Sequence, residues 1–237
     1  MRTKTLPVLA GVALPMIIVG PAYAGFLGLT TVVKEVPAGT PNVEGALVVN
    51  VFATFNRPGS DLFISAAGTA SSPMDIHVVG GTFYQHAFGS DKAPSAALVA
   101  VFPDLAFDSF VTIGVKKVGA PGGQSPDALV LSPGWPGFGA GALGGTNLGW
   151  AVTPNDLQSD PFNPNYISGN GQVLIGQFTT VFNPNISGVS GMFRILVRSN
   201  NVATQLNVSF LHPIPAPGAL ALLGTAGLVG TRRRRRA

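Results

Sequence analysis

The sequence predicts an all-β fold for the residues between its two ends, an antiparallel β-sandwich of jelly-roll-like type. Apolar and polar residues alternate over short runs, as in 192–198, where Phe193, Ile195 and Val197 fall on one face and two arginines on the other. This period of two is typical of a half-buried strand. Clusters of Gly, Pro, Asn and Ser separate the runs, as turns require. No stretch of twelve residues in this part shows the 3.6-residue period of a helix.

About ten strands are expected along the chain, and they do not alternate with helices as in βαβ units. Two antiparallel sheets that bury each other's apolar faces are the simplest arrangement of such strands. A single up-and-down barrel is the alternative. The expected strands are 47–55, 62–65, 76–79, 83–86, 97–102, 107–115, 128–131, 149–152, 172–182, 192–198 and 205–211.

Composition and charge narrow the class of protein. The chain has 237 residues, of which 46% are hydrophobic and 10% charged, and its formal net charge is +4. The positive charge comes from the ends, because residues 25–214 hold seven Lys or Arg against ten Asp or Glu, a net charge of −3. Binding to nucleic acid needs cations clustered on the folded domain, so we expect no nucleic-acid partner. The lack of cysteine excludes disulfides and thiolate metal sites.

The first segment, 1–24, has the pattern of a secretory signal peptide. Basic residues precede an apolar run over 6–19, and Ala22 and Ala24 form a small-x-small cleavage site. This order is the one that signal peptidase recognises. A permanent N-terminal anchor is disfavoured, because prolines interrupt a run already shorter than the roughly 20 residues of a spanning helix. We expect cleavage after Ala24 and export of a domain that spans 25–211.

The last segment, 212–237, predicts a Pro-rich linker, a short transmembrane helix and a basic tail. An apolar run over 219–230 precedes five consecutive arginines. Arginines hold the end of such a segment in the cytoplasm, so we expect the tail to stop transfer in the inner membrane. About 15 helical residues cover roughly 22 Å of a hydrocarbon core of about 30 Å. This short span favours a transient anchor.

The same tail resembles the PEP-CTERM sorting signal of bacteria that possess an outer membrane. That family shows Pro-Glu-Pro, a short Leu/Gly-rich helix and a terminal arginine cluster, and this chain departs from it at Ala216, where the family has Glu. The resemblance covers about the last two dozen residues. It implies processing by an exosortase-like enzyme, release or attachment at the cell surface, and association with exopolysaccharide. An anchor that is never cut is the alternative. The sorting-motif residues are Pro215, Ala216, Pro217, Arg232, Arg233, Arg234, Arg235 and Arg236.

The region 132–166 interrupts the strand pattern with Pro, Gly, Asn and Asp. A loop of this length is often functional. Trp135, Trp150 and Tyr166 are candidates for a platform that stacks against sugar rings, and a small core that pins the loop is the alternative. Oxygen ligands also gather within this region, so Asp156 and Asp160 are weak calcium candidates.

Catalytic signatures are weak by comparison. Asp75 and His77 are two residues apart on an expected strand and can share one face, with His86 nearby in the sequence. Two imidazoles and one carboxylate are a poor metal set, and no spacing favours a Ser-His-Asp site. We expect a noncatalytic surface or extracellular-matrix protein without a cofactor, which passes through the inner membrane. A secreted hydrolase acting on glycan or peptide is the alternative.

Overall fold

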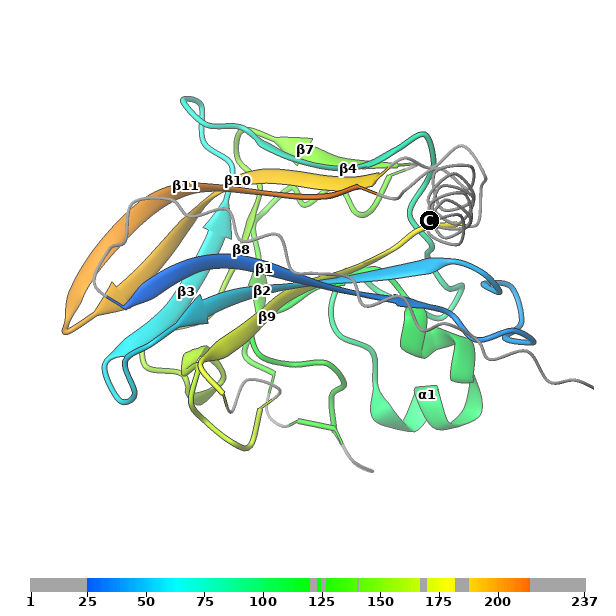
Figure 1. The fold of residues 1–237 in the computed structure, drawn as a ribbon, viewed down its shortest axis with the longest axis horizontal. Coiled ribbons are helices and arrows are strands. Elements are labelled where there is room, and N and C mark those ends of the chain that lie inside the picture. Colours follow the sequence, from blue (N-terminus) through cyan, green and yellow to red (C-terminus); the bar gives the residue numbers. More distant parts are fainter. Residues whose placement is uncertain are drawn as a thin grey trace, which may run out of the picture.

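The computed structural model describes residues 25–119, 123–124, 127–139, 141–166, 170–181 and 188–213. The expected signal peptide, 1–24, lies outside the described residues, and so does the expected sorting tail from residue 214 onward. Within the described residues, no helix is both long enough and apolar enough to cross a membrane. The fold is mostly β and forms two antiparallel sheets, as predicted (Figure 1).

The first sheet has four strands in the order β1-β2-β9-β5. One of its two inner strands, β2, is paired on both sides and carries mostly buried apolar side chains. β1 begins with an irregularity between Phe26 and Gly28, which shifts its register against β2. The bounds are β1 (Phe26–Glu35), β2 (Leu47–Phe55), β9 (Gln172–Thr179) and β5 (Phe110–Val111).

The second sheet has seven strands, with the path β6-β8-β3-β10-β4-β7 and with β11 paired to β10. The long strand β10 organises it. One edge of β10 pairs with β11 along its length, and the other edge pairs first with β4 and then with β3. The bounds are β3 (Asp61–Ala67), β4 (Met74–Val79), β6 (Val130–Leu131), β7 (Ala142–Gly145), β8 (Gly149–Ala151), β10 (Gly188–Ser199) and β11 (Val202–Pro213).

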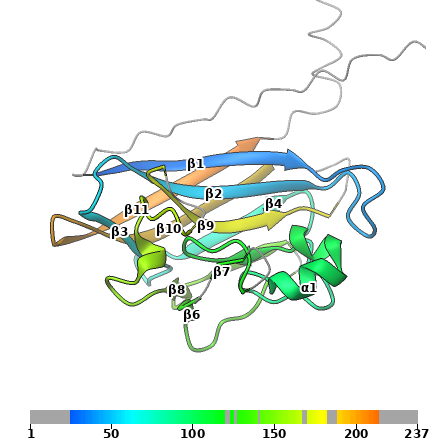
Figure 2. The ribbon, with the colours of Figure 1, turned by 90° about the horizontal axis from the view of Figure 1, so that it is seen from below.

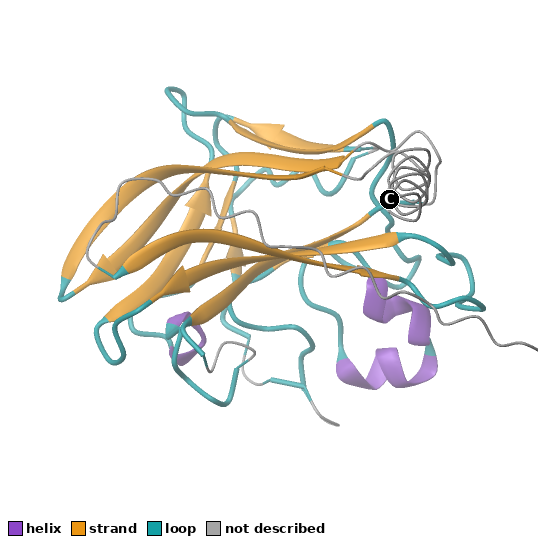
Figure 3. Cartoon of the chain, viewed as in Figure 1, coloured by secondary structure: helices purple, strands orange, loops and turns teal. Residues whose placement is uncertain are grey.

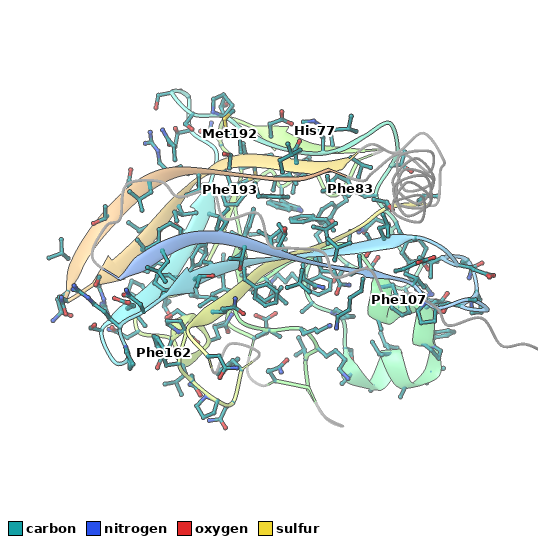
Figure 4. The ribbon with its side chains drawn as sticks, viewed as in Figure 1. His77, Phe83, Phe107, Phe162, Met192 and Phe193 are labelled. Carbon is teal, nitrogen blue, oxygen red and sulfur yellow. The ribbon has the colours of Figure 1, made fainter. Side chains whose placement is uncertain are left out.

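The main core lies between the two sheets and draws buried side chains from both. Phe178 of β9 stacks on Phe210 of β11 with ring centroids 5.9 Å apart, which joins the layers directly. Phe83 and Phe193 lie between the layers, whereas His77 and Met192 lie on the outer side of the seven-stranded sheet (Figure 4). Burial of these aromatic rings supplies much of the hydrophobic stabilisation.

Short helices flank the sheets at one end and along one side (Figures 2 and 3). Helix α1 (Ala96–Val101) occupies the range predicted as the strand 97–102, so that prediction was wrong. Its run of apolar residues is too short for periodicity to separate helix from strand. The 3-10 helix η1 (Pro103–Phe107) follows at once, and η2 (Leu157–Ser159) lies in the β8–β9 connection.

Three further predictions need correction. The expected strand 83–86 does not form, and only an isolated bridge links Phe83 to Thr180. The expected strand 107–115 is regular only over β5. The backbone N–H groups of Thr112 and Gly114 still donate to β9, but the Thr112 hydroxyl donates to the carbonyl of Val115 at 2.7 Å and closes a turn, with Gly114 at a φ of +73°. The region 132–166 is not one continuous loop, since β7 and β8 lie within it and join the seven-stranded sheet. Its irregular parts are residues 132–139 before β7 and the connection that follows β8.

Candidate functional site

A polar cleft of about 450 Å³ lies where three connections meet at one end of the sheets. The β2–β3 turn, the β8–β9 connection and the β10–β11 turn each supply part of its wall. The β2–β3 turn and the β10–β11 turn lie at the same end of the molecule (Figure 1). The lining residues are Gly59, Ser60, Asp61, Leu62, Asn155, Asp156, Leu157, Asp160, Arg198, Asn200 and Asn201.

The β10–β11 turn forms because two asparagines accept positive φ angles. Asn200 and Asn201 have φ of 48° and 63°, and Ser199 pairs with Val202 across them. A two-residue turn with both central residues at positive φ matches the right-handed twist of the strands that it joins. The tight turn brings the guanidinium of Arg198 and both amide side chains to the cleft wall.

The β8–β9 connection is held in place by its own aspartates. The carboxylate of Asp156 accepts a hydrogen bond from the backbone N–H of Gln158 at 3.1 Å and caps η2. Asp160 accepts from the backbone N–H of Phe162 at 2.9 Å. Gln158 is fully buried, and its side-chain amide donates to the carbonyl of Ile113 at 2.9 Å. The connection is therefore an ordered wall that projects Leu157, 64% exposed, beside the carboxylates.

The cleft mixes charges of both signs with polar amides. Asp156 and Asp160 supply two carboxylates, Asp61 adds a buried third in the wall, and Arg198 supplies a guanidinium that donates from Nη2 to the amide oxygen of Asn155. Carboxylates accept hydrogen bonds, guanidinium donates them and amides do both. Such a set suits a ligand rich in hydroxyl groups, because each hydroxyl both donates and accepts.

The calcium candidates Asp156 and Asp160 both lie in this cleft, and Asp61 joins them from β3. Across the described residues, no group of three or more His, Cys, Asp or Glu is placed to hold a metal ion. One carboxylate oxygen of Asp156 and one of Asp160 are already used by backbone N–H groups of their own connection. These two aspartates therefore help to order the loop.

The three candidate stacking residues do not form one exposed face. Trp150 is 1% exposed in the main core and donates from Nε1 to the carbonyl of Thr112 at 3.1 Å. Tyr166 is 7% exposed and belongs to a separate cluster with Phe110. Trp135 is only partly buried and packs against the main core. This arrangement is that of side chains that hold a segment in place.

A second polar constellation lies on the outer face of the seven-stranded sheet. Nδ1 of His77 lies 3.0 Å from a carboxylate oxygen of Asp75, and Nε2 lies 3.1 Å from the hydroxyl of Ser190. The antiparallel register of β4 and β10 sets Ser190 directly opposite His77. The sequence spacing brought out the Asp75–His77 pair, but Ser190 is 113 residues away and only the sheet register identifies it.

His86 lies apart from that group, in a buried network beside η1. Its Nε2 is 3.4 Å from the carboxylate of Asp104, and its backbone N–H donates to Asp108 at 2.7 Å. Burial disfavours the ionised form of Asp104, but the Asn42 hydrogen bond and the neighbouring His86 outweigh it and lower its pKa. Burial raises the pKa of Asp108 to about 7 against the hydrogen bonds of nearby backbone N–H groups. This network therefore connects η1 with the segment after β4, in which His86 lies.

Comparison with known proteins adds no functional information. No family model matches the chain, and neither a curated protein nor a solved structure matches it.

Proposed function

We propose that the chain is an exported, noncatalytic protein of the cell surface or extracellular matrix, and that its polar cleft binds exopolysaccharide. The observation that carries this proposal is the cleft itself, in which a guanidinium, several amides and carboxylates surround the exposed side chain of Leu157. Sugar rings offer hydroxyls for the polar groups and an apolar C–H face for a side chain such as Leu157. Loops on a rigid β scaffold are frequent binding elements.

The two ends of the chain support the cellular part of the proposal. The A-x-A pattern at Ala22 and Ala24 suits signal peptidase. The tail that resembles a PEP-CTERM signal suits an exosortase-like enzyme and a transient stay in the inner membrane. Export would place the cleft where exopolysaccharide is found.

The charge of the cleft narrows the glycan class. The two carboxylates of Asp156 and Asp160 against the guanidinium of Arg198 leave a negative balance, even with the buried Asp61 set aside. An anionic polysaccharide would be repelled, whereas a neutral glycan or an amino sugar would not. We therefore propose neutral or amino-sugar polysaccharides as ligands.

Binding to immobilised dextran, chitosan and alginate tests this proposal. The wild-type exported protein should be retained by dextran or chitosan and not by alginate. Leu157→Ala and Asp160→Asn should each weaken retention about tenfold, the effect of about 1.4 kcal/mol of lost contact. Equal retention of the wild type and both variants, or retention by alginate alone, would refute the cleft as the binding site.

Matched controls exist elsewhere on the surface. Val130 is 63% exposed, close to the 64% of Leu157, and does not line the cleft. Asp91 accepts one backbone N–H bond, from Phe138 at 3.1 Å, as Asp160 does from Phe162. Val130→Ala and Asp91→Asn should leave retention unchanged. Thermal midpoints of all four variants would show that the binding differences do not arise from unfolding.

We also propose that the two-layer arrangement is a β-sandwich. Its support is the main core, which unites side chains of both sheets. The chain crosses from one sheet to the other between β2 and β3 and again between β9 and β10, which suits the jelly-roll-like type. An experimental structure of the exported domain tests this class.

A secreted hydrolase is the second candidate, favoured by the hydrogen-bonded chain from Asp75 through His77 to Ser190. A serine next to an imidazole that a carboxylate orients is the arrangement of a nucleophile and its base. The chain lies on an outer sheet face, and β10 is paired on both sides there, so its backbone amides are committed to the ladders. An oxyanion hole needs free N–H donors. Because the N–H groups of β10 near Ser190 are already paired, we rank hydrolysis below glycan binding as the proposed function.

A fluorophosphonate probe separates the two candidate functions. An activated serine reacts with this probe, whereas an ordinary surface serine does not. We expect no labelling of Ser190. Labelling of the wild type that is lost in both Ser190→Ala and His77→Ala would establish the hydrolase instead.

A further inference from the structure

Asp61, the first residue of β3, has a carboxylate without a countercharge. The residue is 1% exposed. One oxygen, Oδ2, accepts a hydrogen bond from the backbone N–H of Arg57 at 3.1 Å, and the other, Oδ1, is buried without a hydrogen-bond partner. Among the described residues, no Lys or Arg side chain lies within the 4.0 Å of an ion pair with it. A buried carboxylate left in this state is costly, so its retention requires an explanation.

Gly25 lies directly against this carboxylate. Its φ is +98°, and a Cβ at this position would overlap both carboxylate oxygens of Asp61. The carbonyl of Gly25 accepts from the backbone N–H of Asn56 at 3.0 Å, and Phe26 pairs with Phe55 in the next step of the β1–β2 ladder. Gly25 is therefore fixed in place by the sheet. Only glycine fits there, on both conformational and steric grounds.

The backbone nitrogen of Gly25 also lies near this carboxylate. The nitrogen and a Cβ position are both bonded to the same Cα, so the nitrogen lies within about 5 Å of the Asp61 carboxylate. Opposite charges at this separation stabilise each other. In the precursor this nitrogen belongs to a neutral peptide bond. Gly25 is also the residue that would follow the expected cleavage site at Ala24.

We propose that removal of the leader creates the missing countercharge, an α-ammonium on Gly25 that pairs with the Asp61 carboxylate. The inference rests on the processing part of the proposed function. Signal peptidase would hydrolyse the bond between Ala24 and Gly25: water adds its oxygen to the Ala24 carbonyl carbon, and the C–N bond breaks. The leader leaves as a carboxylate, and the freed nitrogen of Gly25 takes up protons to become an ammonium. The mature domain thus gains an ion pair that its precursor lacks.

The pairing would also consolidate the cleft. Asp61 is one of its lining residues, and Gly59, Ser60 and Leu62 of the same turn line it too. Fixing Asp61 would hold that wall in its binding position. Maturation and ligand binding are then coupled through one side chain.

The charged groups around the Gly25–Asp61 pair come from the cleft and from the β2–β3 turn. Arg198, Asp156 and Asp160 line the same cleft as Asp61. Arg57 is adjacent in the β2–β3 turn, and its side chain is exposed. An α-amine has an ordinary pKa of about 8. The carboxylate of Asp61 should raise that pKa, because it favours the protonated form.

The test compares the reactivity of the α-amine in exported protein. N-terminal sequencing first establishes the mature N-terminus. Trace acetylation across pH 6–10, read by mass spectrometry of the N-terminal peptide, then measures the reactivity and the apparent pKa of the amine. The variants are Asp61→Asn and an insertion of Ser-Thr between Ala24 and Gly25, which moves the new amine away and keeps Asp61. Asp75→Asn, a carboxylate removal outside the cleft, is the matched control.

The expected result is a Gly25 N-terminus whose amine reacts about tenfold more slowly at pH 7 than in either variant, which corresponds to a pKa raised by about one unit from its ordinary value of about 8. The control should react as the wild type does. If Asp61→Asn fails to fold, the insertion variant alone tests whether the Gly25 amine pairs with Asp61. A Gly25 N-terminus with equal rates in all proteins overturns this inference alone. A different N-terminus overturns the proposed processing, and the inference with it.

Discussion

Trp135 and Trp150 meet edge to face, with ring centroids 6.1 Å apart and planes at 89°. Trp150 is 1% exposed and also contacts Phe193 of β10, whereas Trp135 is only partly buried at the margin of the core. The two tryptophans of the chain therefore form one anchor, with an inner and an outer member. The inner ring joins β8 to the main core, and the outer ring ties the segment before β7 to it.

This anchor predicts unequal effects of truncation. Trp150→Ala should lower the free energy of unfolding by about 3–5 kcal/mol, because it opens a large cavity in the core. Trp135→Ala should cost clearly less, since its ring is partly exposed and its indole nitrogen is buried without an acceptor. Chemical denaturation of both variants measures the difference. Equal losses would show that Trp135 carries as much of the packing as Trp150.

Local sequence patterns predicted the regular strands well. β2 occupies the predicted range 47–55, and the alternation over 192–198 lies within β10. β10 alternates between buried and less buried residues over this range, whereas β2 has four buried residues in succession, 48–51, before its alternation begins. β1 was missed because an irregularity at Gly28 breaks its alternation, and α1 was misassigned because Leu98 and Val101 remain exposed on a six-residue apolar helix.

The cleft was predictable only in part. The stretch from Asn155 to Asp160 stood out because its oxygen-bearing side chains are close in sequence. Arg198, which contacts Asn155, is 43 residues away, and Asp61 comes from another sheet strand. No local pattern links such residues, because sheet topology alone brings them together.

Gly68 lies immediately after β3, where neighbouring backbone atoms restrict the size of the residue. A Cβ at Gly68 would overlap the carbonyl oxygen of Gly145 and lie 2.5 Å from the backbone nitrogen of Met74. These two residues pair in the β4–β7 ladder. Because backbone atoms cannot rotate aside, Gly68→Ala should lower the free energy of unfolding by at least about 2 kcal/mol.

Gly139 supplies the matched control for that substitution. The nearest atom to its Cβ position is the carbonyl oxygen of Ala142, at 3.5 Å. Gly139→Ala should therefore be neutral or slightly stabilising, since alanine restricts the unfolded chain. Thermal unfolding of both variants is the measurement. A Gly68→Ala protein as stable as Gly139→Ala would mean that β4 and β7 can separate at little cost.

The arginine tail predicts a change in membrane retention. Replacing Arg232, Arg233, Arg234, Arg235 and Arg236 together with glutamine removes the cations that oppose translocation. The altered chain should lose its inner-membrane intermediate and accumulate in the exported soluble fraction. Cell fractionation with detection of the 25–211 domain measures this. Unchanged membrane retention would remove the stop-transfer role from the arginines.

The buried carboxyl of Asp108 should make the free energy of unfolding depend on pH. Burial raises the pKa of its carboxyl to about 7, while hydrogen bonds from the backbone N–H groups of His86, Ser90 and Ser109 oppose the rise and nearby Asp91 adds to it. In the unfolded chain the same group titrates near about 3.9. Between these values the folded state binds more protons than the unfolded state, so stability falls as pH rises from about 4 to 7.

Asp108→Asn removes this titration and keeps an oxygen that accepts from the backbone N–H of His86. The wild type should lose at most about 4 kcal/mol relative to this variant between pH 4 and 7, because each pKa unit corresponds to about 1.4 kcal/mol. Above pH 7 the difference should stay constant. Glu35→Gln, at an exposed strand end, should follow the wild-type profile. Urea unfolding at half-unit steps of pH measures all three proteins, and parallel wild-type and Asp108→Asn profiles would show that Asp108 ionises normally in the folded protein.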